Sequence, residues 1–193
     1  MAVTVTNLIQ GPADLFVGQF GATEPPEEEV ALPVDETSVA TEWRDIGGTQ
    51  GGVTLEVELE YSELEVDQIV DIPESRLTKR TFKVNTNMAE PTLENLRFAF
   101  NGGTINTGAG YKSYSPTMDN SAVSPNYSAA IFDGIAPAGL RRRVIVRKVI
   151  NEATVEQESV KDGQTLLPVE LKAHYVSRSV PPFDYVDEDD GGS

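Results

Sequence analysis

The chain has 193 residues, enough for one domain of ordinary size. It carries 31 Asp and Glu residues against 15 Lys and Arg, and the formal net charge of −16 argues against a protein that binds the outside of DNA or an anionic membrane surface. Because 39% of the residues are hydrophobic, the acidity describes the surface of a chain that can still bury a core.

Cysteine is absent, which excludes disulfides, thiolate metal sites and thiol nucleophiles. The first ten residues have neither a basic region nor a sustained apolar stretch, and no window approaches the roughly 20 apolar residues of a membrane span. We therefore expect no signal peptide, no anchor and no membrane partner.

The first predicted element is a short strand over residues 13–20. An acidic, proline-containing stretch follows at 24–42, and it contains no basic residue and no consistent period. This composition predicts an exposed arm or loop.

The clearest period-two pattern in the sequence begins at Val53 and predicts a half-buried strand. The apolar residues then change phase at Ser62 and Glu63, which predicts a turn or bulge within a hairpin from Val53 to Ile69. A further strand is expected across 77–87. The alternation runs through Val53, Leu55, Val57, Leu59 and Tyr61, with Thr54, Glu56, Glu58 and Glu60 between them.

A helix is predicted at about 90–101. Pro91 suits the first helical turn, Leu93, Leu96 and Phe100 form an apolar stripe, and Gly102 can supply a left-handed stop. A helix this short is marginal alone in water, so we expect its stripe to pack against a sheet.

The second half reads as a long polar loop at 101–126, then strands, then a flexible acidic C-terminal tail at 181–193. Turn residues separate these strands, which are expected at 127–132, 142–150, 154–159 and 167–176. The sequence thus predicts a mainly β domain, residues 1–193, with one helix.

No residue pattern points to catalysis or to a cofactor. His174 is the single histidine and lies in an expected strand without a nucleophile motif nearby. Glu56, Glu58 and Glu60 show no sign of the desolvation that tunes catalytic carboxylates. Residues 187–191 lack EF-hand spacing, and the glycine-rich segment 47–52 lacks the Lys-Ser/Thr of a phosphate-binding loop. We therefore expect no enzyme, no cofactor and no metal.

One cluster of cations stands out in this acidic chain. It is too short and too apolar to indicate a nucleic-acid patch. It is better suited to meet an acidic surface, either within the chain or on a neighbouring copy, and self-association is the sharper hypothesis. Its members are Arg141, Arg142, Arg143, Arg147 and Lys148.

Several short segments, in order, resemble the major tail tube proteins of long, non-contractile-tailed bacteriophages (siphophages). In the first half these are Pro12 to Ala22, Trp43 to Val53, Glu65 to Gln68, Met88 to Leu96 and Gly102-Gly103. In the second half they are Ala130 to Gly134, Arg141 to Lys148, Lys161-Asp162 and Pro168 to Ala173. Together they cover most of the chain.

The resemblance implies a β-sandwich or barrel-like subunit with a flanking helix and no catalysis. Hexameric rings of this subunit would stack into the hollow tube of the virion's tail, assembled in the host bacterial cytoplasm. Partners would be other copies of the chain, the tape measure protein and the tail terminator and tail tip proteins. Viral DNA would pass through the lumen without specific binding.

In such a tube, the strand from Val53 would turn its apolar face to its own core and its acidic face to the lumen, where carboxylates repel phosphates. The expected lumen-facing residues are Glu56, Glu58, Glu60, Glu63, Glu65 and Asp67. The stretches 24–42 and 101–126 are longer than in a minimal version of the tail tube pattern. We expect them to act as inter-ring or inter-subunit arms.

A different class of protein fits the same composition. A monomeric acidic β-domain, acting as a virion decoration or an adhesin that binds a partner or glycan, would also explain the strands and the acidity. It does not predict an acidic–apolar hairpin or a need for self-association.

Overall fold

A computed structural model describes residues 8–65, 67, 70–117, 125–157, 161–189 and 191. Within them the chain is mainly antiparallel β with one α-helix, as the sequence predicts. The helix is α1 (Leu93–Ala99). The strands are β1 (Asp14–Gln19), β2 (Arg44–Asp45), β3 (Thr49–Leu64), β4 (Glu74–Met88), β5 (Thr104–Gly108), β6 (Tyr111–Ser115), β7 (Ser128–Ile135), β8 (Arg141–Asn151), β9 (Leu167–Ala173) and β10 (Phe183–Asp187).

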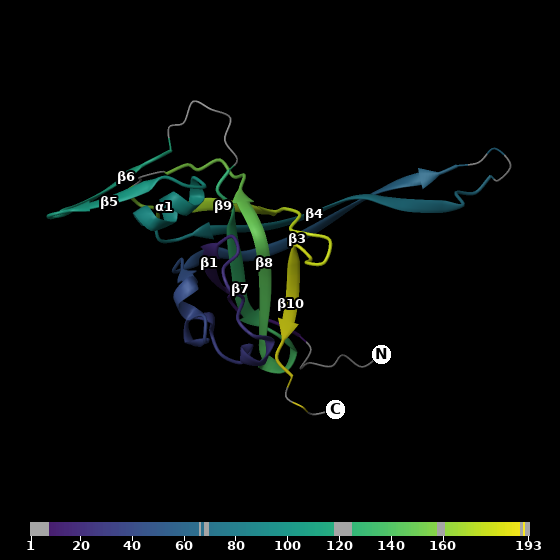
Figure 1. The fold of residues 1–193 in the computed structure, drawn as a ribbon, viewed down its shortest axis with the longest axis horizontal. Coiled ribbons are helices and arrows are strands. Elements are labelled where there is room, and N and C mark those ends of the chain that lie inside the picture. Colours follow the sequence, from purple (N-terminus) through teal and green to yellow (C-terminus); the bar gives the residue numbers. More distant parts are fainter. Residues whose placement is uncertain are drawn as a thin grey trace.

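Among the described residues, the strands other than β5 and β6 form one eight-stranded sheet in the order β2-β1-β7-β8-β9-β4-β3, with β10 also paired to β8. The sheet divides along β8, which pairs with β10 over Arg142–Val146 and with β9 over Val149–Asn151. In Figure 1, β7, β8 and β10 run upright while β3, β4 and β9 cross above them. Two layers therefore face each other across a core.

The main core lies between these layers. It combines alternate residues of β1, β7 and β8 with residues of β4 and β9, and α1 closes one end through Ala99. Phe183 of β10 stacks on Phe82 of β4 with ring centroids 4.1 Å apart. The cluster includes Leu15, Val17, Val84, Ala130, Phe132, Val144, Val146, Leu167, Val169 and Leu171.

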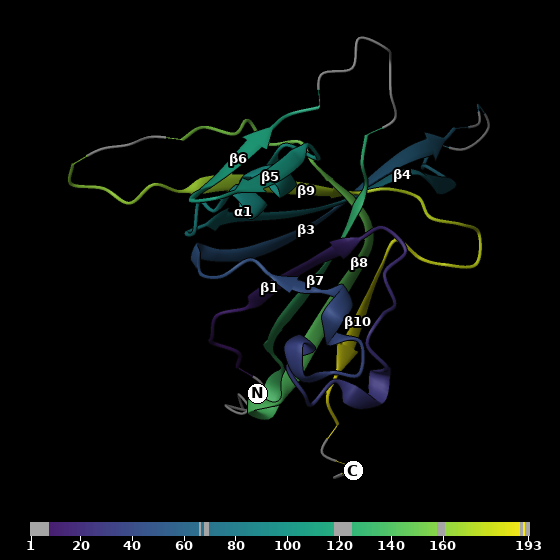
Figure 2. The same cartoon turned by 60° about the vertical axis from the view of Figure 1, so that its left-hand side comes forward.

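The acidic stretch 24–42 is not the exposed arm that its composition predicts. It forms 3₁₀ turns at Glu27–Glu29, Val34–Glu36 and Ala40–Glu42 and lies beside β1 and β7 (Figure 2). Val34 packs with Trp43 on Phe16, Ile131 and Ile145, which point to the outer face of the sheet. Val144, Ile145 and Val146 are consecutive apolar residues, so both faces of β8 need cover, and this segment covers the outer one.

Helix α1 is shorter than predicted and has clear end signals. The N-cap is Thr92, whose side-chain oxygen accepts a hydrogen bond from the Asn95 N–H at 3.2 Å, so Pro91 lies just outside the helix. At the other end Asn101, at φ 54°, takes the left-handed position expected for Gly102. The Gly102 N–H then bonds the Arg97 carbonyl, as in a Schellman motif.

Three predictions for the second half were wrong in part. The polar loop contains a hairpin of β5 and β6, which projects at the opposite end of the molecule from the β3–β4 hairpin (Figure 1). Residues 154–157 form no strand, and 158–159 lie outside the described residues. The acidic tail is not flexible over 183–187, because β10 pairs with β8 there.

Candidate self-association surface on the β3–β4 hairpin

The hairpin of β3 and β4 is longer than the body that it grows from. A strand of 16 residues is about 50 Å long, whereas a compact domain of this size, with a radius of gyration of about 16 Å, is roughly 40 Å across. Val53 and Leu55 pack against the core, and the remainder of the hairpin extends away from the layers (Figure 1). The return strand is β4, so the predicted hairpin from Val53 to Ile69 was wrong and the predicted strand at 77–87 was right.

One face of this extension is apolar and uncovered. Val57, Leu59 and Tyr61 point the same way along β3, and Leu77 lies opposite Tyr61 on β4. Their exposed fractions are 45%, 44%, 58% and 40%. The expectation that the whole alternation packs into the subunit's own core is therefore wrong beyond Leu55. Arg80 lies opposite Leu59 on this face, so the face consists of exposed apolar side chains with one cation among them. Several exposed apolar side chains gathered on one face indicate an interaction surface.

The opposite face carries charge of both signs. Glu56 lies opposite Lys83 and Glu60 opposite Lys79 in the β3–β4 register, with Glu58 between them. Lys79 donates a hydrogen bond to the Glu60 carboxylate, which raises the pKa of Lys79. Lys83 pairs with Glu170 of β9 at 2.7 Å, and this hydrogen bond raises its pKa too. Lysines of β4 thus offset part of the acidity that β3 shows by itself.

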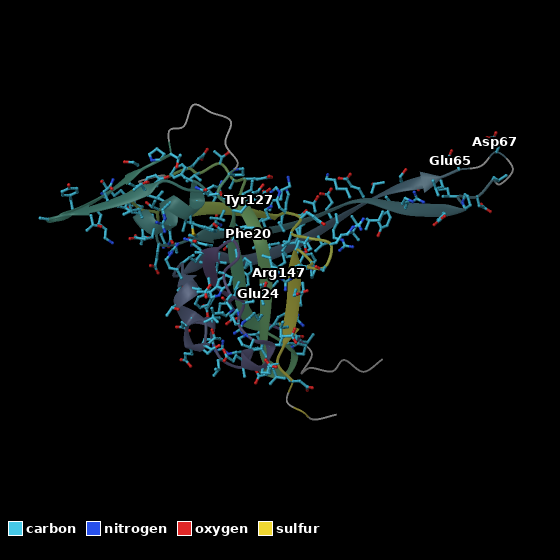
Figure 3. All side chains as sticks on the ribbon, in the orientation of Figure 1. Phe20, Glu24, Glu65, Asp67, Tyr127 and Arg147 are labelled. Atoms are coloured by element: carbon cyan, nitrogen blue, oxygen red, sulfur yellow. The ribbon has the colours of Figure 1, made fainter. Side chains whose placement is uncertain are left out.

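The six acids expected on one face do not share it. The irregularity that the sequence suggests at Ser62 and Glu63 lies instead at Glu60/Tyr61, where β4 contains the unpaired extra residue Thr78. Because β3 itself stays regular, Glu63 follows Tyr61 on the apolar face. Glu65 and Asp67 lie beyond the end of β3, at the free end of the hairpin (Figure 3).

The outer edge of β3 is also open. Within the described residues, β3 ends the strand order and pairs only with β4. The other end of the sheet is β2, which has only two residues. Proteins commonly keep edge strands short or cover them, since unpaired N–H and C=O groups bind other strands. A 16-residue open edge beside an apolar face can therefore accept a strand from another molecule.

The basic residues of β8 are mostly paired within the chain. Arg142 binds Asp187 of β10 through two bonds of 2.6 Å, which lowers the pKa of Asp187. Arg147 binds Glu24 at 2.6 Å, and the two side chains meet in Figure 3. Of the two alternatives open from the sequence, an acidic surface within the chain accounts for these cations. Arg141 lies 4.0 Å from Asp133, and the Lys148 ammonium lies 4.2 Å from the Tyr127 ring centroid.

Arg143 and Asp133 form a buried ion pair that also fixes the segment 24–42. Arg143 Nε lies 2.9 Å from Asp133 Oδ1, and the side chains are 1% and 3% exposed. The guanidinium donates to the Leu32 carbonyl at 2.7 Å, and the Asp133 carboxylate accepts the Val34 N–H at 3.1 Å. The pair thus fastens the acidic segment to the sheet.

The remaining candidates show structural contacts. His174 follows β9, packs edge-on against Tyr127, and has a lowered pKa because it is partly buried and close to Lys172 and Lys148. Gly51 and Gly52, both at positive φ, form the irregularity near the start of β3. Within the described residues, no group of acidic or histidine side chains is arranged to hold a metal ion, and no helix has the length and apolarity to cross a membrane.

Sequence reasoning missed two features of β3: how far the strand extends beyond the body of the subunit, and which lysines of β4 lie opposite its glutamates. The length of the pattern was a usable signal for the first, since about 50 Å exceeds what a domain of this size can cover. No local signal could reveal the second, because it depends on strand register. No known family model matches the chain, and no curated protein sequence matches it either.

Proposed function

We propose that this protein is a structural subunit of a phage tail tube, in which copies join through the β3–β4 hairpin into hexameric rings that stack. The observation that carries the proposal is the β3–β4 hairpin, which combines the open edge of β3 with exposed apolar side chains on its extended part. A monomer leaves both without a partner. Neighbouring copies that add strand to strand supply hydrogen bonds for the edge and cover for the face.

The two faces of the hairpin support a tube with a water-filled lumen. A closed ring of strands needs one face packed on protein and the other toward the interior. In this proposal Val57, Leu59 and Tyr61 face protein, and Glu56, Glu58 and Glu60 face the lumen. Lys79 and Lys83 share that charged face, and both already bind carboxylates. Arg76, opposite Ser62, is a cation of this face that has no ion pair with a described residue. DNA phosphates would therefore meet one free cation beside two that are already bound, and the cargo could slide without being held.

Microscopy and one substitution test this function. Negative-stain images of the purified protein should show rings or tubes. Leu59→Arg should raise the concentration needed for assembly roughly 10–100-fold, because covering one large apolar side chain contributes about 1.5–3 kcal/mol and each 1.4 kcal/mol is tenfold. Glu58→Arg places the same side chain on the charged face and is the matched control, which should still assemble.

Each of these experiments has an outcome that would contradict the proposed tube. A wild-type protein that stays monomeric at all concentrations would refute the tube and favour a monomeric decoration or adhesin domain. Equal effects of Leu59→Arg and Glu58→Arg would show that the apolar face is not the contact. If Glu56→Lys, Glu58→Lys and Glu60→Lys are combined, assembled tubes should retain duplex DNA that wild-type tubes release, and labelling of these positions on the outer surface would contradict the lumen assignment.

A further inference from the structure

The chain contains a cavity lined by two arginines that the ring contacts above do not use. It measures about 530 Å³ and lies between the end of β1, helix α1 and residues 125–128. Arg44 and Arg97 both line it, with Phe20 and Phe98 among the apolar walls. In a chain with a net charge of −16, two arginines in one cavity form a local cationic site that suits an anionic group.

Glu94, the carboxylate among the lining residues, balances only part of the positive charge of this cavity. Glu94 lines the cavity, but its Oε1 binds Lys112 at 3.0 Å. Arg44 Nη1 donates to the neutral Asn95 side chain at 2.7 Å and to the Asp45 carbonyl. The Arg97 guanidinium makes no hydrogen bond or ion pair with the described residues, although the Arg97 carbonyl accepts the Gly102 N–H. Burial and the nearby Arg97 lower the pKa of Arg44, while Glu94 and Asp45 act in the opposite direction. An incoming carboxylate would offset the repulsion between the two arginines.

The free end of the β3–β4 hairpin has the complementary surface. Glu65, Asp67 and Asp71 lie there, and none of them forms an ion pair with a described residue. Val70 is fully exposed and Ile72 is 51% exposed beside them. Carboxylates next to aliphatic side chains match a cavity in which arginines lie next to aromatic rings.

One chain cannot join these two surfaces. Glu65 and Asp67 lie at the far end of the hairpin, while Phe20 and Tyr127, which line the cavity, lie on the body (Figure 3). The views in Figures 1 and 2 agree on this separation. A contact between two different surfaces of identical chains repeats head to tail instead of closing as a symmetric dimer.

We propose that the acidic end of the β3–β4 hairpin of one copy docks into the Arg44–Arg97 cavity of another copy. This inference rests on the proposed function and names the partner surface of the same hairpin. It adds a polar, register-fixing contact to the apolar one, at a place that the open edge of β3 does not reach.

Charge reversal with rescue tests the contact. Arg97→Glu should raise the critical concentration for assembly at least tenfold, and so should Glu65→Arg combined with Asp67→Arg. The triple variant, which reverses both sides, should return to within about threefold of wild type, as each decade corresponds to about 1.4 kcal/mol. Arg178→Glu and Glu28→Arg make the same charge changes at exposed positions elsewhere and should leave the critical concentration unchanged.

A second measurement does not depend on tubes. Because the chain has no cysteine, tagged Asp67→Cys protein can be mixed with untagged Glu94→Cys protein and oxidised. A mixed disulfide is expected, and a mixture of Asp67→Cys with Glu28→Cys should give little of it. Absence of the mixed disulfide, or Arg97→Glu protein that assembles like wild type, would overturn the proposal. Loss of inorganic phosphate binding in Arg97→Glu without an assembly defect would likewise overturn it, by assigning the cavity to a small anion.

The outcomes separate this inference from the proposed function. Normal tubes from Arg97→Glu would reject the cavity contact and keep the tube. A mixed disulfide without rings or tubes would keep the contact and reject the tube. Failure of both assembly and cross-linking would reject both.

Discussion

Replacing Asp133 by asparagine should destabilise the fold more than any surface charge change. The substitution keeps the shape of the side chain and an oxygen for the Val34 N–H, but it removes the charge that Arg143 binds at 2.9 Å. Arg143 is 1% exposed, so its charge would remain buried without a counter-ion. Arg141, 4.0 Å from Asp133, adds a second positive charge to the same place.

The magnitude follows from this burial. Removing one partner of a buried ion pair costs about 3–5 kcal/mol, a large share of the roughly 5–15 kcal/mol that stabilises a domain. For a chain of this length, that lowers the unfolding midpoint by roughly 6–20 °C. Because Arg143 also holds the Leu32 carbonyl, residues 24–42 should detach more often and become easier to cut.

Thermal and urea unfolding followed by circular dichroism measure the loss of stability, and a glutamate-specific protease measures exposure of the 24–42 segment. Asp187→Asn is the matched control, since its partner Arg142 is partly exposed and such pairs contribute at most about 1 kcal/mol. If Asp133→Asn loses no more stability than Asp187→Asn, or if the protease cuts both at the wild-type rate, the buried pair does not hold this segment.

Two further predictions concern stability. Since the fold lowers the pKa of His174 below 6.5, the unfolded chain takes up the proton first; the free energy of unfolding should be highest above pH 6.5 and fall as the pH drops below it. His174 is the single histidine, so His174→Phe should flatten this dependence between pH 7 and 5.5 in urea titrations, and an unchanged slope would contradict the assignment. Thr92→Ala removes the side-chain bond to the Asn95 N–H and should cost about 1 kcal/mol in the same assay; wild-type stability would show that the cap is dispensable.

The charge of the hairpin's polar face could not be predicted from β3 alone, because it depends on which residues of β4 lie opposite. Along β3 the residues Glu56, Glu58 and Glu60 read as an acidic strip, and repulsion of DNA was the expected consequence. Folding places Lys79 and Lys83 on the same side. The proposed lumen face is therefore closer to charge-balanced, and it would avoid DNA because its lysines are occupied as well as because its glutamates repel phosphate.

Local patterns determined much of this protein. Alternation from Val53 predicted a strand, the stripe of Leu93 and Leu96 predicted a helix, and turn residues separated β7, β8 and β9, because each signal depends on neighbours within a few residues. The mainly β class with one helix followed from these signals together.

The tertiary structure decided which segments pack on the sheet and which apolar side chains stay exposed. The segment 24–42 looked like an exposed arm, yet Val34 and the Arg143–Asp133 pair fix it on the sheet, through contacts about a hundred residues apart in sequence. The acidic tail forms β10 because β8 offers it an edge and basic partners, and Phe82 of β4 stacks on Phe183. The apolar stripe of β3 looked like core, but the strand outruns the body. Burial, register and pairing depend on segments that are distant in the sequence, so no local pattern could predict them. The alternation of β3 correctly indicated a strand with one apolar face, and in our proposal another copy of the chain covers the exposed part of that face.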